Sequence, residues 1–250
     1  TYRCGRRIVE LAQSIVPDFE CPPTAHEGYI DRVTSRQLLN LVQPGDFVLS
    51  RRNAPLVSVA LALIRRNVRA RIEGRDIGKG LIAIVKKLAT GPAAHSMPQF
   101  LAKLLVWRDK EHERALKARR YAKAEQVIDQ FDTLTALADG MPGVPGLMNR
   151  LESVFGDTPP GTDVQHVVCS SVHRAKGLET DTVYALESTF AMPITCVCGH
   201  RHWQGKRACD NCDCAGYVPD PAAQIEEDNI RYVAITRAKH LLVWVEGELE

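Results

Sequence analysis

The sequence predicts an α/β fold in which a parallel sheet is interrupted by an all-helical insertion. Short apolar runs alternate with helical patterns on both sides of a long charged stretch, and this order is typical of parallel strands joined by helices. A third feature is a cluster of cysteines within residues 195–216, where we expect a small zinc-binding loop. The chain has 250 residues, 45% of them hydrophobic and 25% charged, which suffices for one such domain with an insertion.

The first part of the chain shows the alternation of helices and strands in order. Residues 6–16 have a helical period that ends at Pro17, and the Pro-rich residues 18–34 are expected to be irregular. Ser35 is the expected N-cap of a short helix that reaches Val42. Further strands are predicted over residues 47–49 and 69–73, and further helices over residues 54–66 and 77–88.

Residues 92–160 are predicted to form the helical insertion, because residues 98–139 are charged and helical throughout. Its stretch Arg108–Glu125 is rich in Lys and Arg, which fits either a solvated helix face or contact with a DNA duplex or a partner. The sheet domain then comprises residues 1–91 and 161–250. Its second part has predicted strands over residues 165–172, 181–186 and 241–245 and a helix over residues 223–234.

Composition excludes several classes of protein. The net charge of +2 gives no global basic field, so any nucleic-acid site is expected to be a local groove. No apolar run approaches the roughly 20 residues of a membrane helix. Clustered cysteines without a secretory leader indicate a reducing, cytoplasmic setting, and a start at Thr1 reads as a piece of a longer polypeptide.

Two long segments carry the most specific pattern. Residues 171–179 read SVHRAKGLE, and residues 226–239 read EEDNIRYVAITRAK. They resemble motifs V and VI of the UvrD/Rep-type superfamily 1 DNA helicases. Residues 1–3, 47–54 and 72–75 are similar to motif IV, the R-x-N-A motif after it, and the turn that follows. The resemblance implies the second RecA-like domain of such a helicase, with a P-loop NTPase-type sheet.

The resemblance also implies residues for a nucleotide site. Arg237 and Arg3 would contact the γ-phosphate of ATP as arginine fingers, Tyr2 would stack on the adenine, and Glu179 would accept a hydrogen bond from the ribose. The chemistry agrees with these roles, because phosphoryl transfer needs positive charge near the γ-phosphate. A surface ion pair is the alternative role for Arg237.

A second set implied by the resemblance concerns single-stranded DNA. His173, Arg51 and Asn53 hold the positions that would contact DNA. A structural role for His173 and a helix-capping role for Asn53 remain open.

The Gly-rich segment Gly74–Gly80 is not expected to bind phosphate. A Walker A loop has four residues between its first glycine and a Gly-Lys-Ser/Thr, whereas three residues intervene here and Gly80 replaces the hydroxyl that binds Mg²⁺. The chain alone is therefore expected not to hydrolyse ATP. The N-terminal RecA-like domain of the same polypeptide is the implied partner and would hold most of the Mg²⁺.

The cysteine cluster favours a tetrahedral Zn²⁺ site, because two cysteine pairs flank a short loop. The expected ligands are Cys196, Cys198, Cys209 and Cys212, with three substitutes in Cys214, His200 and His202. A structural staple is the favoured role, and DNA contact through the basic and aromatic residues of the loop stays open.

Together these patterns predict the C-terminal half of an ATP-dependent DNA helicase or translocase, of a kind that acts in DNA repair or replication. The alternative is a non-catalytic, zinc-containing module that binds DNA or protein and derives from a helicase.

Overall fold

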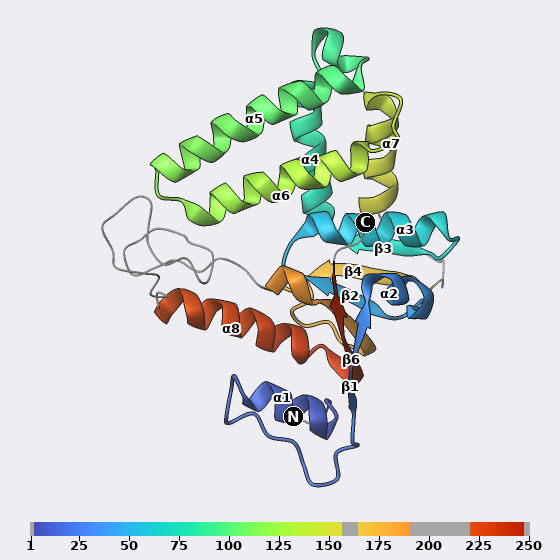
Figure 1. Cartoon of the computed structure of the whole chain (residues 1–250), viewed down its shortest axis with the longest axis vertical. Coiled ribbons are helices and arrows are strands. Elements are labelled where there is room, and N and C mark those ends of the chain that lie inside the picture. Colours follow the sequence, from blue (N-terminus) through green and yellow to red (C-terminus); the bar gives the residue numbers. More distant parts are fainter. Residues whose placement is uncertain (1–2, 157–164, 191–220, 248–250) are drawn as a thin grey trace.

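The computed structural model describes residues 3–156, 165–190 and 221–247. It contains a parallel sheet in the middle of the molecule, with helices above and below it in Figure 1. The strand order is β1-β6-β5-β2-β4-β3, and every neighbouring pair is parallel. The strands are β1 (Tyr29–Thr34), β2 (Phe47–Ser50), β3 (Ala70–Glu73), β4 (Val167–Ser171), β5 (Thr180–Leu186) and β6 (Ala238–Glu246). This confirms the predicted α/β class, and the sheet is consistent with a RecA-like fold.

Helices cover both faces of the sheet. Successive side chains along a strand point to opposite sides, so each face has its own buried apolar layer. On one face, α1 (Arg6–Gln13) and α8 (Pro221–Ile235) pack over strand residues such as Leu49, Val183 and Trp244. On the other face, α2 (Ser35–Leu41) and α3 (Asn53–Arg65) pack over residues such as Val48, Tyr184 and Val245.

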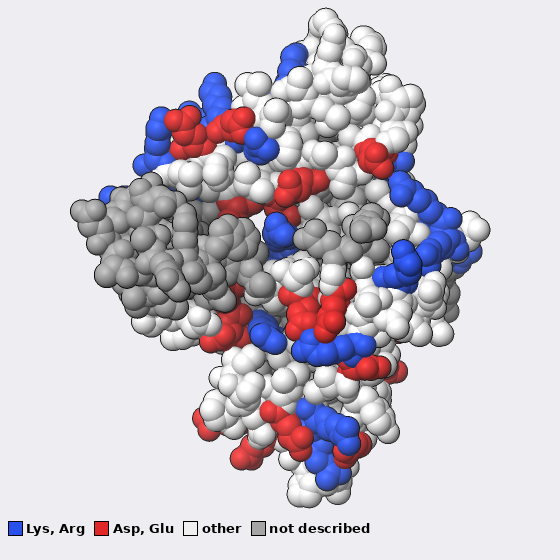
Figure 2. Space-filling view, in the orientation of Figure 1, with Lys and Arg blue, Asp and Glu red and all other residues white. Residues whose placement is uncertain are grey.

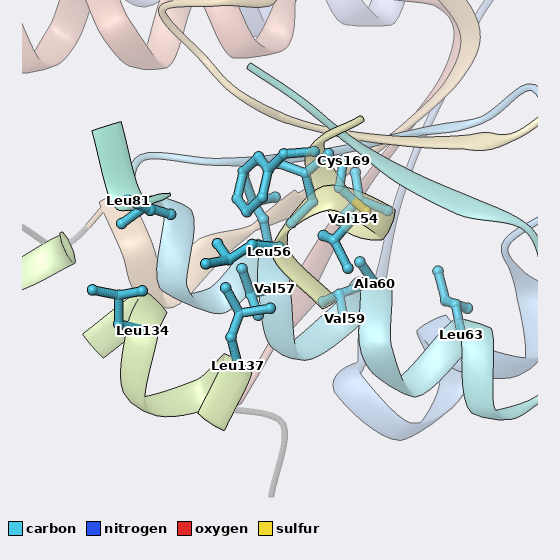
Figure 3. Packing of buried hydrophobic residues seen from close by; sticks show 14 of the residues in the cluster. Leu56, Val57, Val59, Ala60, Leu63, Leu81, Leu134, Leu137, Val154 and Cys169 are labelled. Carbon is cyan, nitrogen blue, oxygen red and sulfur yellow. The ribbon is translucent and has the colours of Figure 1, made fainter. Parts of the chain in front are cut away.

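A layer of helices rests on α3 at the top of Figure 1. It consists of α4 (Arg75–Leu88), α5 (Met97–Lys117), α6 (Tyr121–Ala138) and α7 (Val144–Phe155), and η1 (Gly91–Ala94) leads into α5. Figure 3 shows α3 in the middle of one continuous core, with Leu134 and Leu137 of α6 on one side and Cys169 of β4 on another. The helical layer therefore shares its core with the sheet domain.

Helix α4 packs on α7 and α5, so it lies in the helical layer rather than with the strands that precede it. The contact explains Gly78, where an added Cβ would lie 2.6 Å from the Cβ of Phe155. Residues 75–80, which resemble a phosphate loop in sequence, are helical here. The absence of a side chain at Gly78 thus allows α4 to pack closely against Phe155 of α7.

The prediction for residues 18–34 was wrong at their end, because residues 29–34 form the edge strand β1. Only Val33 of this strand is buried, so the alternating apolar pattern that predicts a strand is missing. Pairing with β6 supplies its backbone hydrogen bonds. The N-cap of α2 is Thr34 instead of Ser35, in a capping box with Gln37.

Candidate nucleotide and DNA site

The predicted site residues lie at two opposite edges of the sheet. Glu179 and Arg237 directly precede β5 and β6, at the edge where the parallel strands begin. Arg51 and His173 follow β2 and β4, at the edge where the strands end. All strands run in one direction, so Glu179 and Arg237 are separated from Arg51 and His173 by the length of the strands.

At the first edge, Glu179 is held between two cations. Its Oε2 accepts a hydrogen bond from Nη1 of Arg3 at 2.6 Å, and its Oε1 lies 3.1 Å from Nζ of Lys239. The backbone N–H of Gly5 donates to the carbonyl of Lys239 at 2.9 Å, which fixes the segment of Arg3 beside β6. Lys239 is the last residue of the second helicase-like segment and was not among the predicted site residues. Tyr2 lies outside the described residues.

The guanidinium of Arg237 is anchored by backbone carbonyls. Nε donates to the carbonyl of Val233 at 3.1 Å, and Nη1 donates to that of Leu178 at 3.0 Å. Partial burial, followed by the charge of Arg3, lowers the pKa of Arg237, although an arginine stays charged at neutral pH. Among the described residues it has no carboxylate partner within ion-pair distance, so its charge is not neutralised.

A titration tests the geometry around Glu179. The hydrogen bond from Arg3, and secondly that from Lys239, lowers the pKa of this carboxyl. Since the folded pKa is depressed, the interaction stabilises the protein at neutral pH and is lost as the pH falls through the folded pKa. We expect Arg3→Ala to raise the pKa of Glu179 more than Lys239→Ala does, as measured by NMR of the side-chain carboxyl. An equal or reversed order would contradict the arrangement.

At the second edge, Arg51 forms a two-point ion pair with Glu227 of α8. The distances are 3.0 Å from Nη2 to Oε1 and 3.3 Å from Nε to Oε2, and the two side chains are only 16% and 18% exposed. Such a pair holds both side chains in place. Arg51 therefore joins the end of β2 to α8.

Asn53 lies at the start of α3 and faces the helical layer. Its side-chain amide donates to Oδ2 of Asp129 at 2.7 Å, and its backbone N–H donates to Oδ1 at 2.8 Å. The backbone N–H of Ala54 donates to the same Oδ1 at 3.0 Å. Asp129 belongs to α6, so α6 caps α3 across the interface, and the side chain of Asn53 does not cap the helix.

His173 is exposed and lines a groove beside α8 together with Lys176, Glu226 and Asn229. The surrounding protein and then the charge of Arg51 lower the pKa of its imidazole, whereas the glutamates of α8 oppose this. His173 thus lies at the surface of this groove rather than in the core.

The model of the UvrD-like helicase C-terminal domain matches residues 96–246, which is more than half of the chain. The chain belongs to this family. The match includes both helicase-like segments and most of the helical layer, whereas residues 1–95 lie before it. A search of curated proteins found no match.

The four predicted zinc ligands of this UvrD-like domain, Cys196, Cys198, Cys209 and Cys212, lie outside the described residues. Within residues 3–156, 165–190 and 221–247, no group of three or more His, Cys, Asp or Glu side chains is placed to hold a metal ion. No helix in these ranges is long and apolar enough to cross a membrane.

Proposed function

We propose that this chain is the second RecA-like half of an ATP-dependent DNA helicase that moves along single-stranded DNA. The observation that carries the proposal is the cluster of Arg3, Arg237, Lys239 and Glu179 where β5 and β6 begin. Three cations and one partly exposed carboxylate suit a ligand that has both a polyphosphate and a ribose.

ATP would bind between this edge and the N-terminal RecA-like domain, which would hold the β-phosphate and Mg²⁺. Phosphoryl transfer from ATP to water would supply the free energy for movement along DNA. Backbone carbonyls rather than a carboxylate hold Arg237, so it would break no ion pair within the described residues when it turns to the γ-phosphate. Arg3 would leave Glu179 and turn to the γ-phosphate, which frees the carboxylate to accept a ribose hydroxyl.

One short segment connects the two edges of the sheet. Residues 172–179 run from the end of β4, where His173 lies, to the start of β5, where Glu179 lies. Arg237 donates to the carbonyl of Leu178 within this segment. A shift of Arg237 toward the γ-phosphate would therefore pull directly on the segment that carries His173.

The proposal is tested by ATP hydrolysis and strand separation. The chain is combined with its proposed N-terminal RecA-like half, and both activities are measured with and without single-stranded DNA. Hydrolysis stimulated by single-stranded DNA supports the proposal. Binding of DNA without any hydrolysis would instead favour a non-catalytic module derived from a helicase.

The proposal includes a structural Zn²⁺ at Cys196, Cys198, Cys209 and Cys212. We expect one equivalent of zinc in protein purified under reducing conditions, as measured by atomic emission. Replacing both Cys196 and Cys209 by serine should abolish zinc binding. Cys21→Ser, which changes a cysteine distant in sequence from the cluster, should leave the zinc content unchanged. Full zinc content in the double variant would contradict this ligand set.

A further inference from the structure

We propose that Arg52, rather than Arg51, is the residue of this loop that binds a phosphodiester of single-stranded DNA, in a pocket that the helical layer completes. The inference rests on the proposed function and names the DNA contact more closely. The resemblance to helicases assigns this role to the residues on either side, Arg51 and Asn53.

Both neighbours of Arg52 are already engaged. The guanidinium of Arg51 is paired with Glu227, and the amide of Asn53 donates to Asp129. To bind DNA, each would have to give up a partner that is largely shielded from water, which costs more than replacing water at an unpaired group.

The guanidinium of Arg52 is differently placed. Its Nε is buried and has no hydrogen-bond partner among the described residues. In the described part of the chain, no carboxylate lies within 4.0 Å of the guanidinium of Arg52. A buried donor without an acceptor is rare in native proteins and indicates a missing ligand or water.

Arg52 lines a pocket of about 270 Å³ where the ends of the strands meet the helical layer. Ser58 of α3, Asp132 of α6, and Ser188 and Thr189 of η2 (Glu187–Phe190) also line it. Figure 2 shows the molecule hollowed between the helical layer and the sheet, with basic and acidic side chains on the walls. A guanidinium and the hydroxyl of a serine are suitable donors for a phosphate, whereas the hydroxyl of Thr189 already donates to the carbonyl of Leu186 at 2.7 Å.

Two carboxylates of α6 act on Arg52 in different ways. Asp129 accepts from the backbone of the two residues after Arg52 and so fixes the course of the loop. Asp132, one turn further along α6, lines the pocket and interacts electrostatically with Arg52. A bound phosphate would compete with Asp132 for the guanidinium, so Asp132 should weaken DNA binding.

This arrangement gives opposite expectations for two variants. Arg52→Gln is expected to raise the Kd of the chain for a fluorescent oligo-dT by about tenfold and to reduce the slope of log K against log salt by about 0.7. Asp132→Asn is expected to lower the Kd by about threefold, because it removes a competing charge near the phosphate. Arg66→Gln is the matched control at the other end of α3, where the side chain is exposed and bonded to Asn40, and its Kd should stay within about twofold of the unchanged chain.

The measurement is fluorescence anisotropy at several salt concentrations, with thermal melting to confirm that each variant folds. Equal Kd values for Arg52→Gln and Arg66→Gln would overturn the inference while leaving the proposed function intact. Weaker binding by Asp132→Asn would overturn it as well. Failure of the unchanged chain to bind oligo-dT would overturn the DNA contact of the proposed function together with this inference.

Discussion

Replacing Arg237 by alanine is expected to lower DNA-stimulated ATP hydrolysis by about 10³-fold or more, with little change in the affinity for single-stranded DNA. The side chain lies where β6 begins, held by the carbonyls of Val233 and Leu178, and has no carboxylate partner within ion-pair distance in the described part of the chain. Its positive charge is therefore available to a γ-phosphate in a closed cleft. The loss should appear in kcat more than in KM, because the charge is needed chiefly in the transition state.

Arg231→Ala is the matched control for this prediction. Arg231 lies on α8, the helix that ends just before Arg237, is exposed, and stacks over Trp244 at 5.1 Å from the ring centroid. Its loss removes the same charge and should change hydrolysis by less than about threefold. Arg237→Lys should behave nearly like the alanine variant, because an ammonium group lacks the fork that reaches two carbonyls at once. Equal activity of the two alanine variants would refute the arginine-finger role.

Replacing Leu134 by alanine is expected to have the largest effect on stability. Leu134 of α6 is fully buried and belongs to the core that also contains Leu56 and Val57 of α3 (Figure 3). Truncation should cost about 2–5 kcal/mol, since it leaves a cavity between helices that cannot close over it. Urea unfolding followed by circular dichroism gives the free energy of unfolding.

The number of transitions in that experiment is informative too. Because one core joins the helical layer to the sheet, we expect both to unfold together in the variant and in the unchanged chain. Leu105→Ala on α5, where the side chain is 42% exposed, should cost less than about 1 kcal/mol. A separate early transition in Leu134→Ala would show that the helical layer folds as an independent domain.

Much of the fold could be predicted from local patterns. Apolar runs predicted β2, β4, β5 and β6, and helical periods predicted the helices around them, because burial of one or both faces determines these patterns. The exposed edge strand β1 was missed, since only Val33 among its residues is buried and a strand of this kind depends on hydrogen bonds to its neighbour.

The sequence by itself determined the family, because residues 171–179 and 226–239 each contain many specific positions in a short stretch. Only the tertiary structure decided how these residues are paired. Arg3 pairs with Glu179, 176 positions further along the sequence, and Arg51 pairs with Glu227 at the same separation. Asn53 is hydrogen-bonded to Asp129, 76 positions away. No local pattern contains such contacts, because they arise when the sheet and the helical layer bring distant segments together. That packing also leaves Nε of Arg52 buried and without a hydrogen-bond partner among the described residues.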